Sequence, residues 1–203
     1  MTRVTRLAPP LAAPLPDVTT ARLDLRRFAP SDLDELADVF AQHEVWVFPF
    51  GRGFTRDETQ AFLDAQLDEW TELGMGCWIA RTRADGRVIG YLGLSVPTFL
   101  PEILPAVEVG WRLAPDAWGH GYATEGATAA LDHAFATLAL ERVCSLPQAD
   151  NTRSVRVAER LGMTRTRDLL APPTDHRGAV AVAHFEVTAA EWDERATRPG
   201  RPA

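Results

Sequence analysis

The segment from Val107 to Glu125, VEVGWRLAPDAWGHGYATE, constrains the fold more than any other part of the sequence. Its start, over 107–113, predicts a strand, and apolar side chains at helical spacing over 119–138 predict a long helix. A strand that runs through a glycine-bearing loop into a helix leaves the first N–H groups of that helix unpaired, at the positive end of its dipole. The segment therefore predicts an anion site, where Gly119 and Gly121 let a phosphate approach the backbone.

Two nucleotide-binding patterns fail on single residues. A dinucleotide fingerprint needs a third glycine at position 124, which here is Thr124. A phosphate-binding loop of the Walker type needs a lysine, and all 21 basic residues of this chain are arginine. The missing lysine also excludes Schiff-base chemistry on a lysine. From the segment alone, a glycine turn that only caps the helix stays open as the alternative.

The rest of the chain interleaves strands and helices. Asp85-Gly86 predicts a hairpin, so the sheet of this α/β chain has to be mixed. Ser31 is the expected N-cap of a first helix, and His43–Phe54 is expected to be a loop or short helix. Further strands are predicted at 22–28, 77–82, 87–96, 143–146, 163–167 and 180–187, and further helices at 55–74 and 151–161.

Length and composition fit one domain with short tails. The chain has 203 residues, of which 46% are hydrophobic. We expect residues 1–20 to be a flexible arm, 21–192 a single domain and 193–203 a flexible tail. The net charge of −7 disfavours nucleic acid as a partner, and no apolar run approaches the roughly 20 residues that span a membrane. Cys77 and Cys144 are expected to be buried thiols, the five histidines lack a metal spacing, and we expect a cytoplasmic protein without a metal.

Two ordered motifs resemble those of a known family. The tract Trp118–Glu125 resembles motif A of the GNAT N-acetyltransferases, in the branch that contains the ribosomal-protein N-terminal acetyltransferases. Asn151–Ser154, followed by Ala158–Met163, is similar to motif B of that family. The likeness covers about residues 20–192. It implies a GNAT fold, a mixed and twisted sheet of six to seven strands flanked by about four helices.

The resemblance implies acetyl-coenzyme A as cofactor. Its pantetheine would pair with the end of the strand at Trp111–Leu113, its thioester would lie near Val109, and Asn151 would bind the pantetheine amide. Its pyrophosphate would lie on backbone N–H groups of Trp118, Gly119, His120, Gly121, Tyr122, Ala123 and Thr124.

The resemblance also implies direct attack by an amine, which needs a base and an acid but no protein nucleophile. Glu108 is the strand carboxylate nearest the expected thioester and is the predicted base; the alternative is a carboxylate that faces solvent. A tyrosine in motif B of many family members corresponds here to Ala158, so Ser154 is the predicted acid. The alternative is that Asn151 and Ser154 only cap their helix.

The acceptor is less constrained than the cofactor. Trp46, Phe48 and Phe50 are the expected wall of the acceptor site, or else part of the core. The first choice of acceptor is the N-terminal amine of a protein or peptide. A small-molecule amine, including an antibiotic, and a non-catalytic module that binds acyl-coenzyme A remain alternatives. The resemblance is compatible with a monomer or a homodimer.

Overall fold

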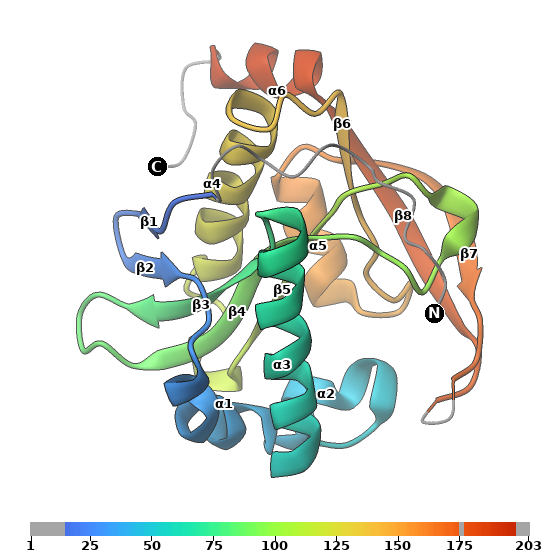
Figure 1. Ribbon diagram of the computed structural model, residues 1–203. Helices are drawn as coiled ribbons and strands as arrows, with labels where there is room; N and C mark the ends of the chain where they lie inside the picture. Colours follow the sequence, from blue (N-terminus) through green and yellow to red (C-terminus); the bar gives the residue numbers. More distant parts are fainter. Residues whose placement is uncertain (1–14, 175–176, 198–203) are drawn as a thin grey trace.

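One sheet carries the fold (Figure 1), and the computed structural model describes residues 15–174 and 177–197. In these residues, eight strands follow the spatial order β1-β2-β3-β4-β5-β6-β8-β7. The strands are Val18–Thr19 (β1), Leu23–Arg26 (β2), Cys77–Thr82 (β3), Val88–Ser95 (β4), Glu108–Leu113 (β5), Arg142–Ser145 (β6), Thr164–Ala171 (β7) and Val180–Thr188 (β8). The helices are Leu33–Phe40 (α1), His43–Phe50 (α2), Arg56–Leu73 (α3), Tyr122–Ala136 (α4), Thr152–Arg160 (α5) and Ala189–Ala196 (α6). Short 3-10 turns lie at Pro30–Asp32 (η1), Pro101–Ile103 (η2) and Pro115–Ala117 (η3).

Alternation along the central strands builds a core on each face of the sheet. Trp78 and Leu92 belong to the cluster that packs against α4, whereas Ile79 packs with residues of α1 to α3. Figure 1 shows α3 and α4 on opposite sides of the sheet. Helix α4 can approach the sheet closely because Gly126 has no side chain. A Cβ at this position would lie only 2.2 Å from Leu92 Cδ2.

The sheet opens between β5 and β6. This parallel pair has a single register position, Glu108 opposite Cys144, where the Cys144 N–H donates to the Val107 carbonyl at 2.9 Å. On its other side β5 pairs with β4 from Glu108 to Leu113. Beyond Glu108, no described strand pairs with the β6-facing edge of β5. The two halves of the sheet therefore diverge at Glu108.

The mixed α/β class is confirmed, but the element counts were too low at six to seven strands and about four helices. The extra strand is β1, whose two residues are too few to show an alternating pattern. Val18 pairs with Leu25, and Leu15 is buried, so residues 15–20 belong to the fold and not to an arm. The remainder of the predicted arm, residues 1–14, lies outside the described residues.

The predicted tail is also corrected, because α6 reaches residue 196. Thr188 and Glu191 form a capping box, in which the Thr188 N–H donates to Glu191 Oε2 at 2.8 Å. Trp192 is buried beside Phe135 of α4, with ring centres 6.1 Å apart. The sequence did not predict this short helix because its residues are mostly polar. Trp192 is the side chain that packs it against the core. Residues 198–203 of the predicted tail lie outside the described part of the chain.

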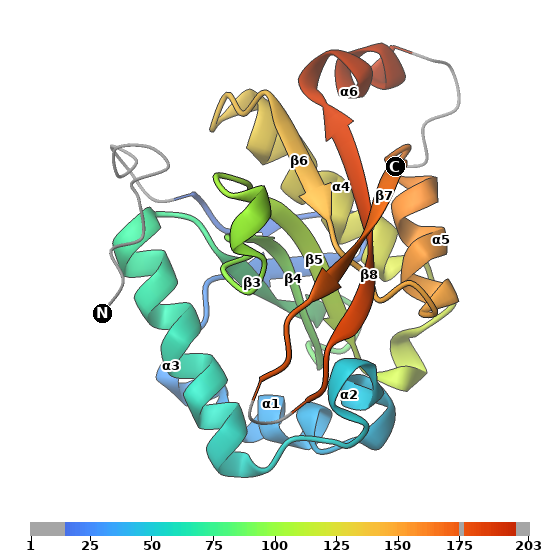
Figure 2. The same cartoon turned by 90° about the vertical axis from the view of Figure 1, so that its right-hand side faces the viewer.

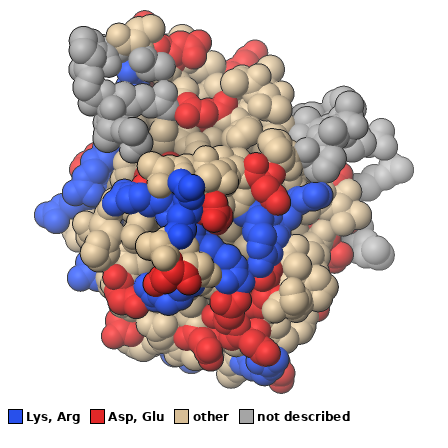
Figure 3. Space-filling model, turned by 90° about the vertical axis from the view of Figure 1, so that its left-hand side faces the viewer, with Lys and Arg blue, Asp and Glu red and all other residues tan. Residues whose placement is uncertain are grey.

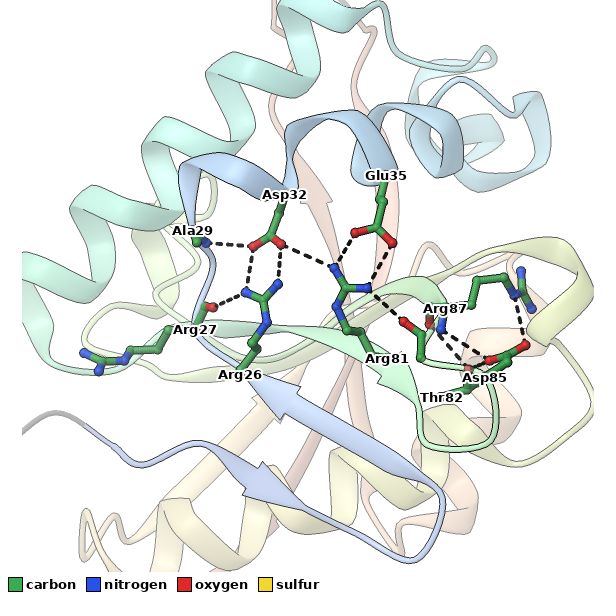
Figure 4. A network of polar contacts seen from close by, with 10 residues as sticks. Arg26, Arg27, Ala29, Asp32, Glu35, Arg81, Thr82, Asp85 and Arg87 are labelled. Carbon is green, nitrogen blue, oxygen red and sulfur yellow. Dashed lines mark hydrogen bonds and ion pairs between the residues drawn. The ribbon is translucent and has the colours of Figure 1, made fainter.

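Two predicted helix starts are displaced. Ser31 lies inside η1 and does not cap, because α1 begins only at Leu33 and its N-cap position is Asp32, whose carboxylate accepts from the Ala29 N–H at 2.7 Å. Asp32 lies between Arg26 and Arg81 in a buried ion-pair network (Figure 4). Helix α4 begins at Tyr122 rather than 119, since Gly121 has a left-handed φ of 83°.

Charges of both signs alternate on the surface near the β1–β3 edge (Figure 3). Exposed ion pairs there join Arg83 to Asp24 and Arg87 to Asp116. Such pairs contribute little to stability individually. They do show that the net charge of −7 is not spread as one acidic surface.

Candidate functional site

The loop before α4 has the geometry of an anion cradle. Gly119 and Gly121 have φ values of 80° and 83°, which only glycine adopts at little cost. No atom within 4 Å would meet a Cβ at Gly119, and no side chain caps the helix. The Trp118 indole N–H donates to the Leu113 carbonyl at 2.8 Å, which ties the loop to the end of β5. The first N–H groups of α4 are therefore presented where an anion can reach them.

Arg22, which lies between β1 and β2, donates hydrogen bonds to this loop and to the first turn of α4. Its Nη1 donates to the His120 carbonyl at 2.8 Å, and its Nε donates to Glu125 Oε2 at 2.7 Å. Glu125 also accepts from the Arg22 N–H at 2.8 Å and the Thr20 hydroxyl at 2.6 Å. Burial opposes ionisation of Glu125, but these hydrogen bonds outweigh it and lower its pKa. The carboxylate thus has a structural task at the start of α4.

Arginines supply positive charge around the cradle. The guanidinium of Arg22 lies 4.9 Å from the centre of the Tyr122 ring, and that of Arg153, on α5, lies 4.5 Å from the Trp118 ring. Asp116 is paired with Arg87 at 2.8 Å. The guanidinium groups of Arg22 and Arg153 fit a ligand with several negative charges, as a pyrophosphate has.

One cavity of about 1300 Å³ joins the cradle to the gap between β5 and β6 and to helix α2. The structure brings nearly all predicted site residues to its wall. Those that line it are Trp46, Phe48, Phe50, Glu108, Trp111, Leu113, Trp118, Gly119, His120, Gly121, Tyr122, Ala123, Thr124, Asn151 and Ser154. Val109 is the exception, because its side chain points into the α4-facing core and is fully buried. That residue can offer only its backbone.

Glu108 lies at the point where the sheet divides. Burial raises its pKa to about 7, although a hydrogen bond from the Leu146 backbone and the nearby Arg112 favour the charged form. Glu69 raises it further. A Cβ built on Gly110 would meet one atom within 4 Å, Glu108 Oε1 at 3.9 Å, so free space adjoins this carboxylate. A carboxyl group that titrates near neutrality beside free space is suited to accept a proton there.

The predicted acid and its neighbour form a helix cap. Asn151 is the N-cap of α5, and its Oδ1 accepts from the Ser154 N–H at 3.2 Å. Both residues also line the cavity. Capping therefore uses the Asn151 oxygen and the Ser154 backbone, and the Ser154 hydroxyl has no part in the cap.

The aromatic segment belongs both to the core and to the cavity wall. Trp46 is buried and stacks on Phe54 with ring centres 3.8 Å apart. Phe50 packs 5.7 Å from Trp46. Phe48 breaks the helix, with φ −104° and ψ 121°, and lines the cavity outside that aromatic cluster. Figure 2 shows the loop between β7 and β8 near α2, and Thr174 and Arg177 of that loop line the same cavity.

Sequence reasoning missed several polar side chains of the site, among them Arg22, Gln66 and Arg112. Arg112 follows Glu108 by four residues, so strand alternation places both on one face and would have identified it. Gln66 is a polar residue on the apolar face of α3, which is a weaker signal. Arg22 meets Glu125 across 103 positions, and no local pattern predicts such a contact.

Two further properties bear on the kind of site. Within residues 15–174 and 177–197, no three His, Cys, Asp or Glu side chains gather in a group that could hold a metal ion. None of the described helices has the length and apolarity needed to cross a bilayer. Cys77 and Cys144 are free and buried, as predicted.

Comparison with known proteins identifies the family. The family described as acetyltransferase (GNAT) domain matches residues 22–164. The uncharacterized protein YkkB of Bacillus subtilis is 37% identical over 90 residues, which are 44% of this chain and 51%, about half, of that protein. The FsC-acetyl coenzyme A-N(2)-transacetylase of Aspergillus fumigatus is 30% identical over 193 residues, covering 87% of this chain and 78% of that protein.

A solved structure gives the same result for the fold. The crystal structure of an acetyltransferase from Agrobacterium tumefaciens is 30% identical, covers 85% of this chain and 94% of that chain, and has a TM-score of 0.67. The divergence of β5 from β6 and the glycine cradle of α4 are thus seen in a chain that matches the family over most of its length. The protein belongs to the GNAT acetyltransferases, enzymes that transfer an acetyl group from acetyl-coenzyme A to an amine.

Proposed function

We propose that this enzyme acetylates the N-terminal amine of a protein or peptide, which attacks acetyl-coenzyme A directly while both are bound. The observation that supports direct attack by an amine is Glu108, whose pKa of about 7 belongs to a carboxyl group next to free space at Gly110. A base with a pKa near the working pH is effective in removing a proton from an ammonium group.

The cofactor end of the cavity fits a phosphorylated ligand. The backbone from Trp118 to Thr124 would hold the pyrophosphate, with Arg22 and Arg153 adding positive charge. The β6-facing edge of β5 at Trp111–Leu113 has no partner strand and would offer backbone groups to the amides of the pantetheine. Acetyl-coenzyme A supplies the activated acetyl group as a thioester.

Two side chains would move the protons. Glu108 takes a proton from the acceptor ammonium, directly or through a water, so that the nitrogen can bond to the acetyl carbon. The carbon–sulfur bond breaks as the carbon–nitrogen bond forms. The Ser154 hydroxyl, which lines the cavity, would give a proton to the departing sulfur and regain one from the nitrogen, which has to lose its second proton to form the amide.

A small-molecule amine is the second candidate acceptor. It is favoured by the match to the Aspergillus transacetylase, whose name describes transfer to N(2) of FsC and which aligns with 87% of this chain. The cavity volume of about 1300 Å³ accommodates either class together with a cofactor.

The test follows thiol release from acetyl-coenzyme A with short peptides and with small amines as acceptors. Turnover should be highest with free N-terminal peptides and should rise with pH through about 7, the pKa of Glu108. In Glu108→Gln, kcat/KM should fall by a factor of about 10² to 10⁴, and the rising limb of the pH profile near pH 7 should vanish. The exposed Glu102 provides the control variant Glu102→Gln, which should behave like the wild type.

Two results would contradict the proposal. Wild-type turnover and an unchanged pH limb in Glu108→Gln would remove Glu108 from the mechanism. Tight binding of coenzyme A with no turnover of any amine would instead support the non-catalytic alternative.

A further inference from the structure

Helix α3 contributes one polar side chain to the cavity, and that side chain has an unpaired oxygen. Gln66 lines the cavity and is only 9% exposed. Its Nε2 donates to Glu69 Oε2 at 3.2 Å, whereas its Oε1 is buried without a hydrogen-bond partner. Among the described residues four buried side-chain atoms lack partners, and those of Trp46, Gln66 and Gln148 belong to residues that line this cavity. Such atoms are rare in folded proteins, so their concentration here indicates a ligand that pairs with them.

The chemistry of Glu69 fixes how the Gln66 amide is oriented. A carboxylate accepts hydrogen bonds and donates none, so Gln66 has to turn its NH₂ group to Glu69 and leave its carbonyl oxygen free. The second oxygen of Glu69 accepts from the Val96 N–H at 3.2 Å. Burial raises the pKa of Glu69, and no described cation acts on it. The carboxylate therefore holds Gln66 in place without an arginine to balance its charge.

The same end of the cavity holds a second carboxylate. Ser95 of β4 pairs with Glu108 of β5, and the N–H of the next residue, Val96, donates to Glu69, which places both carboxylates at the same end of these strands. Arg112 is the nearby cation, but its Nη1 already donates to the carbonyls of Val45 and Phe48. A ligand group that enters between Gln66 and Glu108 has to donate hydrogen bonds, and it gains most if it is positively charged.

We propose that Gln66, oriented by Glu69, determines acceptor specificity: its Oε1 accepts a hydrogen bond from a cationic amine that has no carboxylate beside the reacting nitrogen. A free amino acid would bring its α-carboxylate against Glu108 and Glu69 and is rejected. An amino acid amide, a peptide N-terminus or a simple amine meets no such repulsion. The inference rests on the proposed function in one respect, that the acceptor binds at the Glu108 end of the cavity.

The experiment compares matched acceptors that differ in charge. L-phenylalanine amide and L-phenylalanine have the same side chain, but only the second carries a carboxylate; L-leucine amide and L-leucine form a second pair. Acetyl transfer is measured for the wild type, Gln66→Met, Glu69→Gln and Gln60→Met. Gln60 is the matched control, since its Nε2 donates to Asp64 Oδ1 at 2.8 Å on the same helix but outside the cavity wall.

The wild type and Gln60→Met should prefer each amide over its amino acid by at least about tenfold in kcat/KM. Gln66→Met should raise the KM for the amides about tenfold, because the ammonium group loses a hydrogen-bond acceptor, with the KM for acetyl-coenzyme A unchanged. Glu69→Gln, which removes one of the two carboxylates that repel an α-carboxylate, should reduce the preference for the amides.

Equal use of both members of each pair, no turnover of either amide, or identical kinetics of Gln66→Met and Gln60→Met would overturn the inference. The result for Glu108 is separate. A raised KM for the amides in Gln66→Met, combined with an unaltered pH limb in Glu108→Gln, would reject Glu108 as the base but leave the role of Gln66 standing.

Discussion

The guanidinium carbon of Arg112 lies 3.8 Å from the centre of the Trp46 ring. The opposite face of that indole is occupied by Phe54, which is nearly parallel to it at an interplanar angle of 7°. Arg112 lies on β5 and Trp46 on α2, so the contact joins the strand that carries Glu108 to a helix that lines the cavity. Nη1 of Arg112 also donates to the Phe48 carbonyl at 2.8 Å, at the break in α2.

Arg112→Met should therefore disturb both the acceptor wall and the base. The KM for the acceptor should rise roughly tenfold because α2 loses its anchor. The pH limb of kcat/KM should move to higher pH, since Arg112 favours the charged form of Glu108. Arg112→Lys keeps the charge but not the planar fork, so it should raise KM and leave the limb in place. The same limb in the wild type and Arg112→Met would show that the charge of Arg112 does not act on Glu108.

Gly110→Ala should inactivate without unfolding. Its Cβ would enter the free space 3.9 Å from Glu108 Oε1, and its backbone is not in the left-handed region. We expect an unchanged melting temperature and a roughly tenfold loss of acceptor turnover. Gly93→Ala is the contrast, because a Cβ there would lie 2.7 Å from Cys77 Cα at a φ of 149°. That variant should lose about 1–3 kcal/mol of unfolding free energy by urea titration. Full activity in Gly110→Ala would mean that the acceptor does not use this space.

Glu125→Gln should weaken both the fold and cofactor binding. The carboxylate accepts from Thr20 and twice from Arg22, and Arg22 holds the His120 carbonyl of the cradle. The substitution should lower the free energy of unfolding by about 1–3 kcal/mol and raise the Kd for coenzyme A, measured by calorimetry. Asp116→Asn breaks the exposed pair with Arg87 and should change stability by less than about 0.5 kcal/mol. A wild-type Kd for coenzyme A in Glu125→Gln would show that the contacts between Glu125 and Arg22 do not affect ligand binding at the loop before α4.

Asp32 should make stability depend on pH in the acid range. Burial opposes its ionisation, but hydrogen bonds from Arg26 and Ala29 outweigh it, so its pKa lies below the ordinary value of 3.8. Its stabilising contribution is therefore present above pH 3.8 and is lost as pH falls through the lower, folded-state pKa. Asp32→Asn should cost about 1–3 kcal/mol at pH 7, because its arginine partners are partly exposed to water, and progressively less in acid, measured by urea unfolding.

Asp34→Asn is the control for this network, since that side chain is exposed and pairs only at the surface with Arg56. A cost for Asp32→Asn that stays the same from pH 7 to pH 3 would mean that the charge of Asp32 is not what stabilises the network.

The features that the sequence predicts correctly are those that depend on residues close together in the chain. The glycines at 119 and 121, the strand at 107–113 and the cap at Asn151 depend on neighbours within a few residues, and the structure has each of them. The contacts that complete the site join residues far apart in the chain. Arg22 meets Glu125 across 103 positions, and Arg112 meets Val45 across 67. The spacing of apolar residues along the chain does not predict such long-range pairs, so only the three-dimensional structure reveals them.

The divergence of β5 from β6 leaves one edge of β5 without a partner strand inside the molecule. On an outer strand such an edge is a template on which another chain can add a strand and start aggregation. Here the edge lies within a cavity whose walls include residues of α2, α4 and α5. A slender ligand can pair with it, whereas a strand of a neighbouring molecule, with strands on either side, cannot enter. The fold thus keeps an open sheet edge inside its cavity without exposing that edge to other proteins.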